Sequence, residues 1–212
     1  MLNINEIFYS IQGESSAAGL PTVFVRLTGC NLRCSYCDTE YAFYEGNEYQ
    51  INEVVDIVER YNCGLVEITG GEPLLQKDVF PLMTKLCDLG FDVMLETSGS
   101  LSIENVDKRV KIVMDLKCPS SGMVNKNLYG NIEFLKPNDE VKFVIGTRDD
   151  YIWAKEQIEK FSLINKVEVL FSPVFDSIEP KRIVEWILQD KLKVRFQLQL
   201  HKYIWEPETK GV

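Results

Sequence analysis

Residues 24–39, FVRLTGCNLRCSYCDT, join a short β-rich run to a loop that carries three cysteines. Cys30, Cys34 and Cys37 have the spacing C-x3-C-x2-C, which places three thiols in one loop directly after a predicted strand. Three neighbouring thiolates suit a cubane iron–sulfur cluster, which contains four irons. Without a fourth protein ligand, one iron keeps an open coordination position, as a catalytic zinc does for water. The loop therefore predicts a cluster that can bind a further molecule.

A structural zinc site is the main alternative for this loop. Such a site usually has four ligands, and no nearby C-x2-C or H-x3-H pair supplies the fourth, since the only histidine is His201. A cluster is therefore the better interpretation. We interpret Cys63 and Cys87 as small core residues, whereas Cys118 follows a predicted strand and is placed near the cofactor without being a ligand.

Short β-rich runs alternate with amphipathic segments along the chain, which is typical of a parallel sheet wrapped by helices. Seven such units are fewer than a closed eightfold barrel requires. We therefore expect an α/β fold, a partial, open (β/α) barrel with parallel strands, formed as a single domain over residues 1–212. The predicted strands lie near 22–27, 65–69, 91–96, 111–116, 140–145, 166–171 and 193–199, and the predicted helices at 52–61, 73–89, 149–161 and 179–190.

Polar or small residues follow each predicted strand. Because the carboxyl ends of parallel strands build the active site in such folds, these endings should converge on one mouth. The endings are 28–30, 69–72, 96–99, 115–117, 146–148, 172–173 and 201–202.

Composition narrows the class of partner. The chain has 23 Lys plus Arg against 32 Asp plus Glu, a net charge of -9, which argues against nucleic acid as a direct substrate. No run of about 18 apolar residues occurs, and the amino-terminal sequence lacks the basic and apolar regions of a signal peptide. We expect a cytoplasmic protein with no membrane segment.

The cysteine loop resembles the signature of the radical S-adenosylmethionine superfamily, and Tyr36 fits the aromatic position before its last cysteine. Residues 69–73, TGGEP, resemble the GGEP motif of that superfamily. Paired glycines also allow a close backbone approach to a ligand, and a carboxylate suits an ammonium group. The resemblance implies a 4Fe-4S cluster whose open iron binds S-adenosylmethionine and cleaves it to a 5'-deoxyadenosyl radical.

The resemblance also implies a set of cofactor contacts. The later strand endings in this set are equally typical of helix caps and turns. The implied contacts are Tyr36, Cys37, Asp38, Gly71, Glu72, Cys118, Pro119, Ser120, Ser172, Pro173, Val174 and Phe175.

Four further segments narrow the resemblance: EIFYSIQGE at 6–14, FVRL at 24–27, CDT at 37–39 and QLHKY at 199–203. Together they resemble the 7-carboxy-7-deazaguanine synthase family of queuosine biosynthesis over nearly the whole chain. The resemblance implies a ring-contracting carbon–nitrogen lyase that converts 6-carboxy-5,6,7,8-tetrahydropterin to 7-carboxy-7-deazaguanine and releases ammonia. The radical would take hydrogen from C6 and return it, regenerating S-adenosylmethionine.

The substrate contacts implied by this resemblance also make chemical sense. Polar groups near Gln12 match the donors and acceptors of a pterin edge, and Arg26 suits a carboxylate, although a surface ion pair is its alternative. Thr39 matches the position of a magnesium ligand, whereas a turn or cap is the alternative for Thr39 and Thr69. The implied substrate contacts are Ile11, Gln12, Gly13, Glu14, Arg26 and Thr69.

One departure from the family pattern lies after Glu14. Ser15 and Ser16 stand where the family usually has a glycine, which predicts a different bend of this loop. The family's terminal carboxylate sometimes contributes to the substrate site, and here the tail EPETKGV extends past His201. His201 suits either a proton donor or a structural role.

Two other functions fit the cysteine loop. An enzyme that installs a glycyl radical on a protein partner has the same cysteine spacing but needs neither the QGE segment nor Arg26. A non-catalytic iron–sulfur or zinc module predicts no cleavage of S-adenosylmethionine. The family resemblance further implies flavodoxin or ferredoxin as electron donor and a homodimer.

Overall fold

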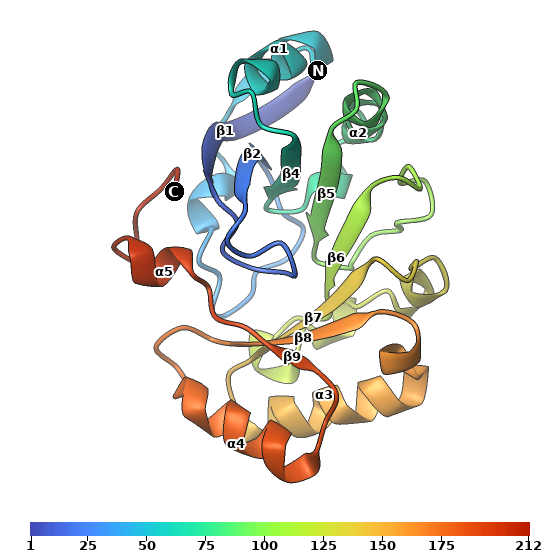
Figure 1. The fold of residues 1–212 in the computed structure, drawn as a ribbon, viewed down its shortest axis with the longest axis vertical. Helices are drawn as coiled ribbons and strands as arrows, with labels where there is room; N and C mark the ends of the chain where they lie inside the picture. Colours follow the sequence, from blue (N-terminus) through green and yellow to red (C-terminus); the bar gives the residue numbers. More distant parts are fainter.

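The computed structural model describes residues 1–212 and contains one nine-stranded sheet with the order β3-β1-β2-β4-β5-β6-β7-β8-β9. β1 pairs antiparallel with β2 and β3, whereas β2 and β4 to β9 run parallel to one another. The strands are β1 Leu2–Ile11, β2 Pro21–Leu27, β3 Asn47–Tyr49, β4 Leu65–Gly70, β5 Asp92–Thr97, β6 Lys111–Asp115, β7 Glu140–Ile145, β8 Glu168–Pro173 and β9 Arg195–Phe196. The sheet curves without closing, so the predicted partial, open barrel is confirmed (Figure 1).

α1 to α4 lie on the outer side of the curved sheet, whereas α5 contributes to the wall of the interior cavity (Figure 1). α3 begins with a capping box in which Thr147 and Asp150 exchange hydrogen bonds, and α4 begins with Pro180, which needs no intrahelical partner for its nitrogen. α4 ends where Lys191 takes a left-handed conformation. The helices are α1 Ile51–Arg60, α2 Val79–Asp88, α3 Arg148–Phe161, α4 Pro180–Asp190 and α5 His201–Ile204.

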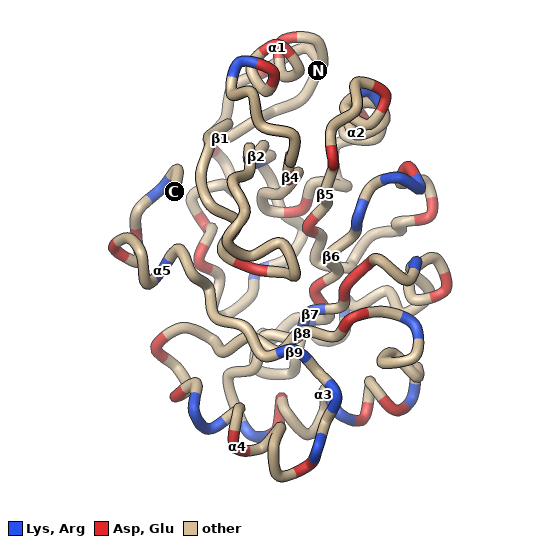
Figure 2. Tube along the Cα trace, in the orientation of Figure 1, with Lys and Arg blue, Asp and Glu red and all other residues tan.

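The side chains of successive residues in each strand face opposite sides of the sheet. In β4, Val66 and Ile68 pack in the apolar core beneath the helices, whereas Glu67 and Thr69 face the barrel interior and line a cavity. This alternation follows from the period of two along a strand. Charged residues elsewhere are spread over helices and loops without a basic stripe (Figure 2).

Several elements differ from the sequence predictions, and the short strand β3 and the short helix α5 were not predicted. The strand β1 was not predicted, although its alternating burial suits a strand at the side of a sheet. The single helix predicted for 73–89 is wrong: Pro73–Leu75 form a 3-10 turn and α2 begins only at Val79. The strand predicted for 193–199 is reduced to the two residues of β9, because the chain turns away to form α5.

The loop after β1 closes the amino-terminal side of the barrel. Ala17 packs against Met94, Val113 and Leu170, which face the interior from three strands. The Ser16 amide donates to the Glu140 carboxylate at the start of β7, with N–O distances of 3.2 and 3.3 Å. The cavity therefore has a floor and opens towards the carboxyl ends of the strands.

The bend expected to change in this loop keeps a shape typical of glycine. Ser15 has a φ of 64°, the left-handed region that glycine adopts without cost. Its hydroxyl accepts a hydrogen bond from the Ala17 amide at 3.1 Å, which supports the turn locally. The serine thus takes a backbone conformation that glycine adopts freely, and a path different from that of the family stays a prediction.

We predict that Ser15→Gly leaves the free energy of unfolding within about 1 kcal/mol of the wild-type value, because relief of the backbone conformation offsets the lost hydrogen bond. Ser15→Val should cost about 1–3 kcal/mol, since a β-branched residue is poorly tolerated at positive φ. Urea unfolding of both variants measures the difference. Equal stabilities would show that the bend does not constrain the loop.

Candidate functional site

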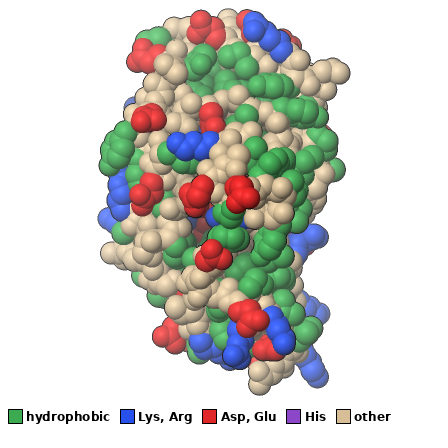
Figure 3. All heavy atoms as spheres, turned by 90° about the vertical axis from the view of Figure 1, so that its left-hand side faces the viewer, with side chains coloured by type: hydrophobic (Ala, Val, Ile, Leu, Met, Phe, Trp, Pro, Cys, Tyr) green, Lys and Arg blue, Asp and Glu red, His purple; other side chains and the backbone are tan.

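A cavity of about 720 Å³ occupies the barrel interior at the carboxyl ends of the strands. Figure 3 shows a side of the molecule where acidic side chains surround a hollow. The cavity is lined by all six predicted substrate contacts, by the three cysteines of the loop and by Thr39. It is also lined by the predicted cofactor contacts Tyr36, Asp38, Gly71, Ser172, Pro173, Val174 and Phe175.

The three thiols fit a cluster better than a single metal ion. Cys30, Cys34 and Cys37 are free and half-buried, and all face the cavity. No three His, Cys, Asp or Glu side chains in the protein come close enough together to hold one ion. Burial raises the pKa of each thiol, so loading with iron must release protons. Separated thiols around a cavity suit the corners of a cubane.

The glycine pair of residues 70–71 packs directly against the cysteine loop. A Cβ on Gly71 would collide with the Gly29 carbonyl and the Cys30 side chain. The Glu72 amide donates to the same Gly29 carbonyl at 2.8 Å. Gly71 is therefore required because two backbones touch here, and this contact holds the cysteine loop at the ends of β2 and β4.

Glu72 does not line the cavity in this structure, and its expected contact with an ammonium group stays a prediction. The Glu72 carboxylate is completely buried and accepts hydrogen bonds from Thr97 Oγ1, the Ser98 amide and hydroxyl, and the Leu74 amide. These donors occupy the lone pairs of the carboxylate. Glu72 instead fixes the turn after β5 against the glycine pair.

Cys118, Pro119 and Ser120 lie outside the cavity wall in this structure, and their role as cofactor contacts stays a prediction. The Cys118 side chain is buried in the apolar core. The turn that it begins instead contacts the cysteine loop, because Ser35 Oγ donates to the Ser120 carbonyl at 2.7 Å. This turn supports the loop from behind.

A buried ammonium group connects the interior carboxylates. Lys142 Nζ lies 2.9 Å from Glu14 Oε2 and also forms a short ion pair with Glu96. Burial alone would lower the pKa of Lys142, but the two carboxylates raise it well above its ordinary value. Burial alone would raise the pKa of Glu14, yet Lys142 lowers it. Both groups are therefore charged at neutral pH.

Glu67 lies in the same interior, and its pKa shifts in the direction opposite to that of Glu14. Burial, with the nearby Glu96 and Glu14, raises the pKa of Glu67 well above its ordinary value. Gln12 Nε2 donates to Glu67 Oε2, and Gln12 Oε1 accepts from the Glu14 amide at 3.0 Å. Glu67 lines the cavity. The interior thus combines a carboxyl with a raised pKa and one with a lowered pKa, those of Glu67 and Glu14.

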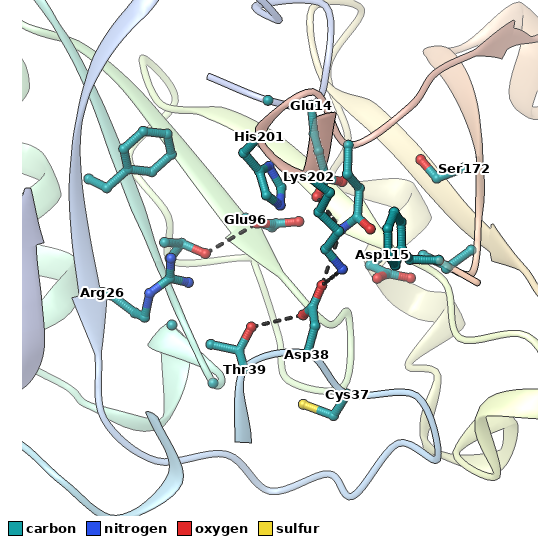
Figure 4. A pocket seen from close by; sticks show the side chains of 18 of the residues that line it. Glu14, Arg26, Cys37, Asp38, Thr39, Glu96, Asp115, Ser172, His201 and Lys202 are labelled. Carbon is teal, nitrogen blue, oxygen red and sulfur yellow. Dashed lines mark hydrogen bonds and ion pairs between the residues drawn. The ribbon is translucent and has the colours of Figure 1, made fainter. Parts of the chain in front are cut away.

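Arg26 enters the cavity in a fixed orientation (Figure 4). Its Nε donates to Glu6 Oε1 at 2.7 Å, and the Tyr41 hydroxyl donates to the same oxygen at 2.9 Å. The guanidinium also packs over the Phe8 ring, 5.6 Å from the centroid. These contacts leave the two terminal nitrogens of Arg26 available to a carboxylate in the cavity.

The carboxy-terminal segment completes the wall (Figure 4). Gln199 Nε2 donates to Glu14 Oε1 at 3.0 Å and to Asp38 Oδ2 at 3.2 Å, while Lys202 Nζ donates to Asp38 Oδ2 at 2.8 Å. His201 packs so closely on Gly13 that a Cβ on Gly13 would not fit. Burial lowers the pKa of His201. A neutral His201 therefore lies between the loop after β1 and the cavity.

Comparison with known proteins decides the family. Residues 24–187 match the Radical SAM superfamily. A 7-carboxy-7-deazaguanine synthase from Chlorobaculum tepidum is 48% identical over 215 residues, covering 100% of this chain and 97% of the relative. Another from Koribacter versatilis is 45% identical over 226 residues, covering 100% of both. The chain belongs to the 7-carboxy-7-deazaguanine synthase family.

Solved structures agree on the fold of this synthase family. QueE from Escherichia coli has a TM-score of 0.77 at 23% identity, covering 93% of each chain. Streptococcus suis SuiB bound to S-adenosylmethionine has a TM-score of 0.60 at 18% identity, covering 81% of this chain and 48% of SuiB. The predicted family and fold are confirmed, and the chain is a radical S-adenosylmethionine lyase that uses a 4Fe-4S cluster. None of its helices has the length and hydropathy needed to cross a membrane.

Several synthase residues at this site were not predicted as contacts from the sequence. Glu67 is the one charged residue of β4, and Lys142 is flanked by apolar residues inside β7, so each was an available signal for an interior polar site. Gln199 and Lys202 lie in the QLHKY segment, one of those that resemble the family, but their contacts with Asp38 beside the cysteine loop are seen only in the folded chain.

We predict that Lys142→Met destabilises the protein by roughly 3–5 kcal/mol, because it leaves two partly buried carboxylates without their buried cation. The unpaired carboxyls then have folded-state pKa values above their unfolded values. The deficit in the free energy of unfolding, relative to the wild type, should therefore shrink as pH falls from about 8 to about 5. Urea unfolding across this pH range measures the deficit, with Lys155→Met as a control at a more exposed ion pair. A deficit that is constant with pH would contradict this explanation.

Proposed function

We propose that this cavity converts 6-carboxy-5,6,7,8-tetrahydropterin to 7-carboxy-7-deazaguanine and ammonia, as a step of queuosine or related deazapurine biosynthesis. The observation that carries the proposal is the meeting, in one cavity, of three cysteines suited to a cluster and a separate set of pterin-compatible groups. A protein-activating enzyme would not need that second set. Its presence favours a small heterocyclic substrate.

The cofactor end of the cavity is assigned to the cysteine loop and the strand endings beside it. Cys30, Cys34 and Cys37 would hold the cluster, with Gly71 and Tyr36 close to bound S-adenosylmethionine. When bound, these groups supply hydrogen-atom abstraction and return at the substrate. The 172–175 segment forms the remaining wall at this end and would limit access of water to the reacting atoms.

The substrate end is assigned to the charged interior of the barrel. The Gln12 amide, the Glu14 carboxylate and the backbone of residues 11–13 present donors and acceptors suited to the pyrimidine edge of a pterin. Arg26 would hold the substrate carboxylate through its free terminal nitrogens. Because these groups are buried and mutually braced, an analogue that lacks a matching atom would leave one of them unpaired.

Magnesium is assigned to Thr39, with Asp38 beside it. Thr39 Oγ1 donates to Asp38 Oδ1 at 2.9 Å, so two oxygen groups lie together at the cavity edge. Magnesium prefers oxygen ligands and retains several waters, which suits such a sparse site. Lys202 pairs with Asp38 in this structure, so the ion would compete with that ammonium group for the carboxylate.

The remaining assignments concern partners and location. Reduction of the cluster requires an electron donor, and we assign a flavodoxin or ferredoxin to this role. We further assign the protein to the cytoplasm, where a reducing environment preserves free thiols, and to a homodimer.

We predict that the anaerobically reconstituted, reduced protein forms 7-carboxy-7-deazaguanine from 6-carboxytetrahydropterin, S-adenosylmethionine and magnesium. S-adenosylmethionine should be recovered nearly completely. Cys34→Ala should abolish product because it removes a cluster ligand, while Cys87→Ala, at a thiol outside the cavity, should retain activity. Mass spectrometry of the reaction mixture measures both compounds. Cleavage of S-adenosylmethionine with the pterin unchanged would reject the substrate but retain the radical chemistry.

We predict that Arg26→Gln raises the KM for the pterin by roughly 10- to 100-fold, the range expected when a hydrogen bond between charged groups is lost. Steady-state kinetics with saturating S-adenosylmethionine measures the effect. Arg182→Gln, at an exposed surface arginine, is the matched control. The variant should also bind a pterin without the 6-carboxylate as well as the wild type does. A fall in kcat with unchanged KM would contradict a role in holding the carboxylate.

A further inference from the structure

A chain of hydrogen bonds joins the start of α3 to the middle of the cysteine loop. We propose that Asp150 is a positioning residue for the iron–sulfur cluster, acting through the turn at residues 118–121 and through Ser35. The inference rests on the cluster chemistry of the family and not on the identity of the pterin. It assigns a role in the cofactor site to a residue that lies outside the cavity.

The first link is the Asp150 carboxylate, which is completely buried at the first turn of α3. Oδ1 accepts from the Ser120 amide at 2.9 Å. Oδ2 accepts from the Ser120 hydroxyl at 2.5 Å and from the Gly146 and Thr147 amides, each at 3.0 Å. No cation pairs with this carboxylate in the protein, so amide donors and the helix amino terminus stabilise its charge.

The second link is the turn itself. Ser121 Oγ donates to the Cys118 carbonyl at 2.6 Å, and Gly122 ends the turn with a φ of 72°. The carbonyls of Ser120 and Ser121 are thereby held side by side. They accept hydrogen bonds from the hydroxyl and the amide of Ser35, at 2.7 and 3.1 Å respectively.

The third link is the position of Ser35 between two cluster ligands. It directly follows Cys34 and lies two residues before Cys37, so its double contact fixes the backbone that carries both thiols. The other side of the loop is fixed separately, by the contact of Gly71 with Gly29 and Cys30. Asp150 therefore governs one half of the cluster site and the glycine pair governs the other.

The substitution Asp150→Asn separates this role from simple packing. An asparagine has nearly the same shape, but its NH2 group replaces one of the two oxygens that accept hydrogen bonds. In either orientation of the side chain, this NH2 group faces N–H or O–H donors. At least one hydrogen bond is lost and two donors are brought together. Asp149→Asn is the matched control. Asp149 is exposed on the same turn of α3, and its substitution removes the same formal charge.

The experiment compares wild type, Asp150→Asn, Ser35→Ala and Asp149→Asn after anaerobic reconstitution. Iron and sulfide content, the rate of cluster loss to a chelator and the EPR spectrum of the reduced cluster with and without S-adenosylmethionine are measured well below each Tm. We expect Asp150→Asn and Ser35→Ala to lose the cluster about tenfold faster, the size typical for residues that orient metal ligands, and to alter the EPR response. Asp149→Asn should match the wild type.

The double variant distinguishes a shared route from two independent effects. If Asp150 acts through Ser35, the double variant should lose its cluster no faster than Asp150→Asn alone. Additive effects would overturn the proposed route. A lowered Tm for Asp150→Asn with unchanged cluster loss and EPR spectra would also overturn the proposal, because Asp150 would then be only a helix cap.

Discussion

The need to pair a buried ammonium group organises the interior of this protein. Lys142 projects from β7 into the barrel, where an unpaired charge would cost several kcal/mol. Its partners come from β5, as Glu96, and from the loop after β1, as Glu14. Gln199 then connects Glu14 to Asp38 beside the cysteine loop. Two ion pairs and the hydrogen bonds of Gln199 thus link five segments that are distant in the chain, and each presents a side chain to the same cavity.

Close backbone packing provides the second constraint, because a cluster loop must be held without blocking its open face. Gly71 meets Gly29 and Cys30 from one side, where any side chain would collide. Ser120 and Ser121 meet Ser35 from the other side through their carbonyls. Neither contact uses the thiols, so all three stay directed at the cavity. The loop is therefore held from behind, and its reactive groups remain free for iron.

The sequence was sufficient for the parallel strands, the cysteine loop and the wall of the cavity, because these depend on local patterns and spacings. The sequence was insufficient where tertiary contacts decide the direction of a side chain. Glu72 belongs to a motif that suggests a ligand, yet its carboxylate is saturated by Thr97, Ser98 and Leu74, which lie at another strand end or in the next turn. Cys118 follows a strand at the right depth, but its side chain turns into the core. Motif position predicts the backbone, whereas side-chain direction depends on the neighbouring elements.

The position of Ser15 shows why a departure from a motif need not change a site. The bend after Glu14 is imposed by its surroundings: Ala17 fills the barrel floor and the Ser16 amide binds Glu140. Those contacts require a left-handed residue, and a serine that binds its own backbone adopts this conformation at modest cost. With this bend Glu14 Oε2 lies 2.9 Å from Lys142 Nζ. What the site requires at Ser15 is a backbone angle, and more than one residue type can supply it.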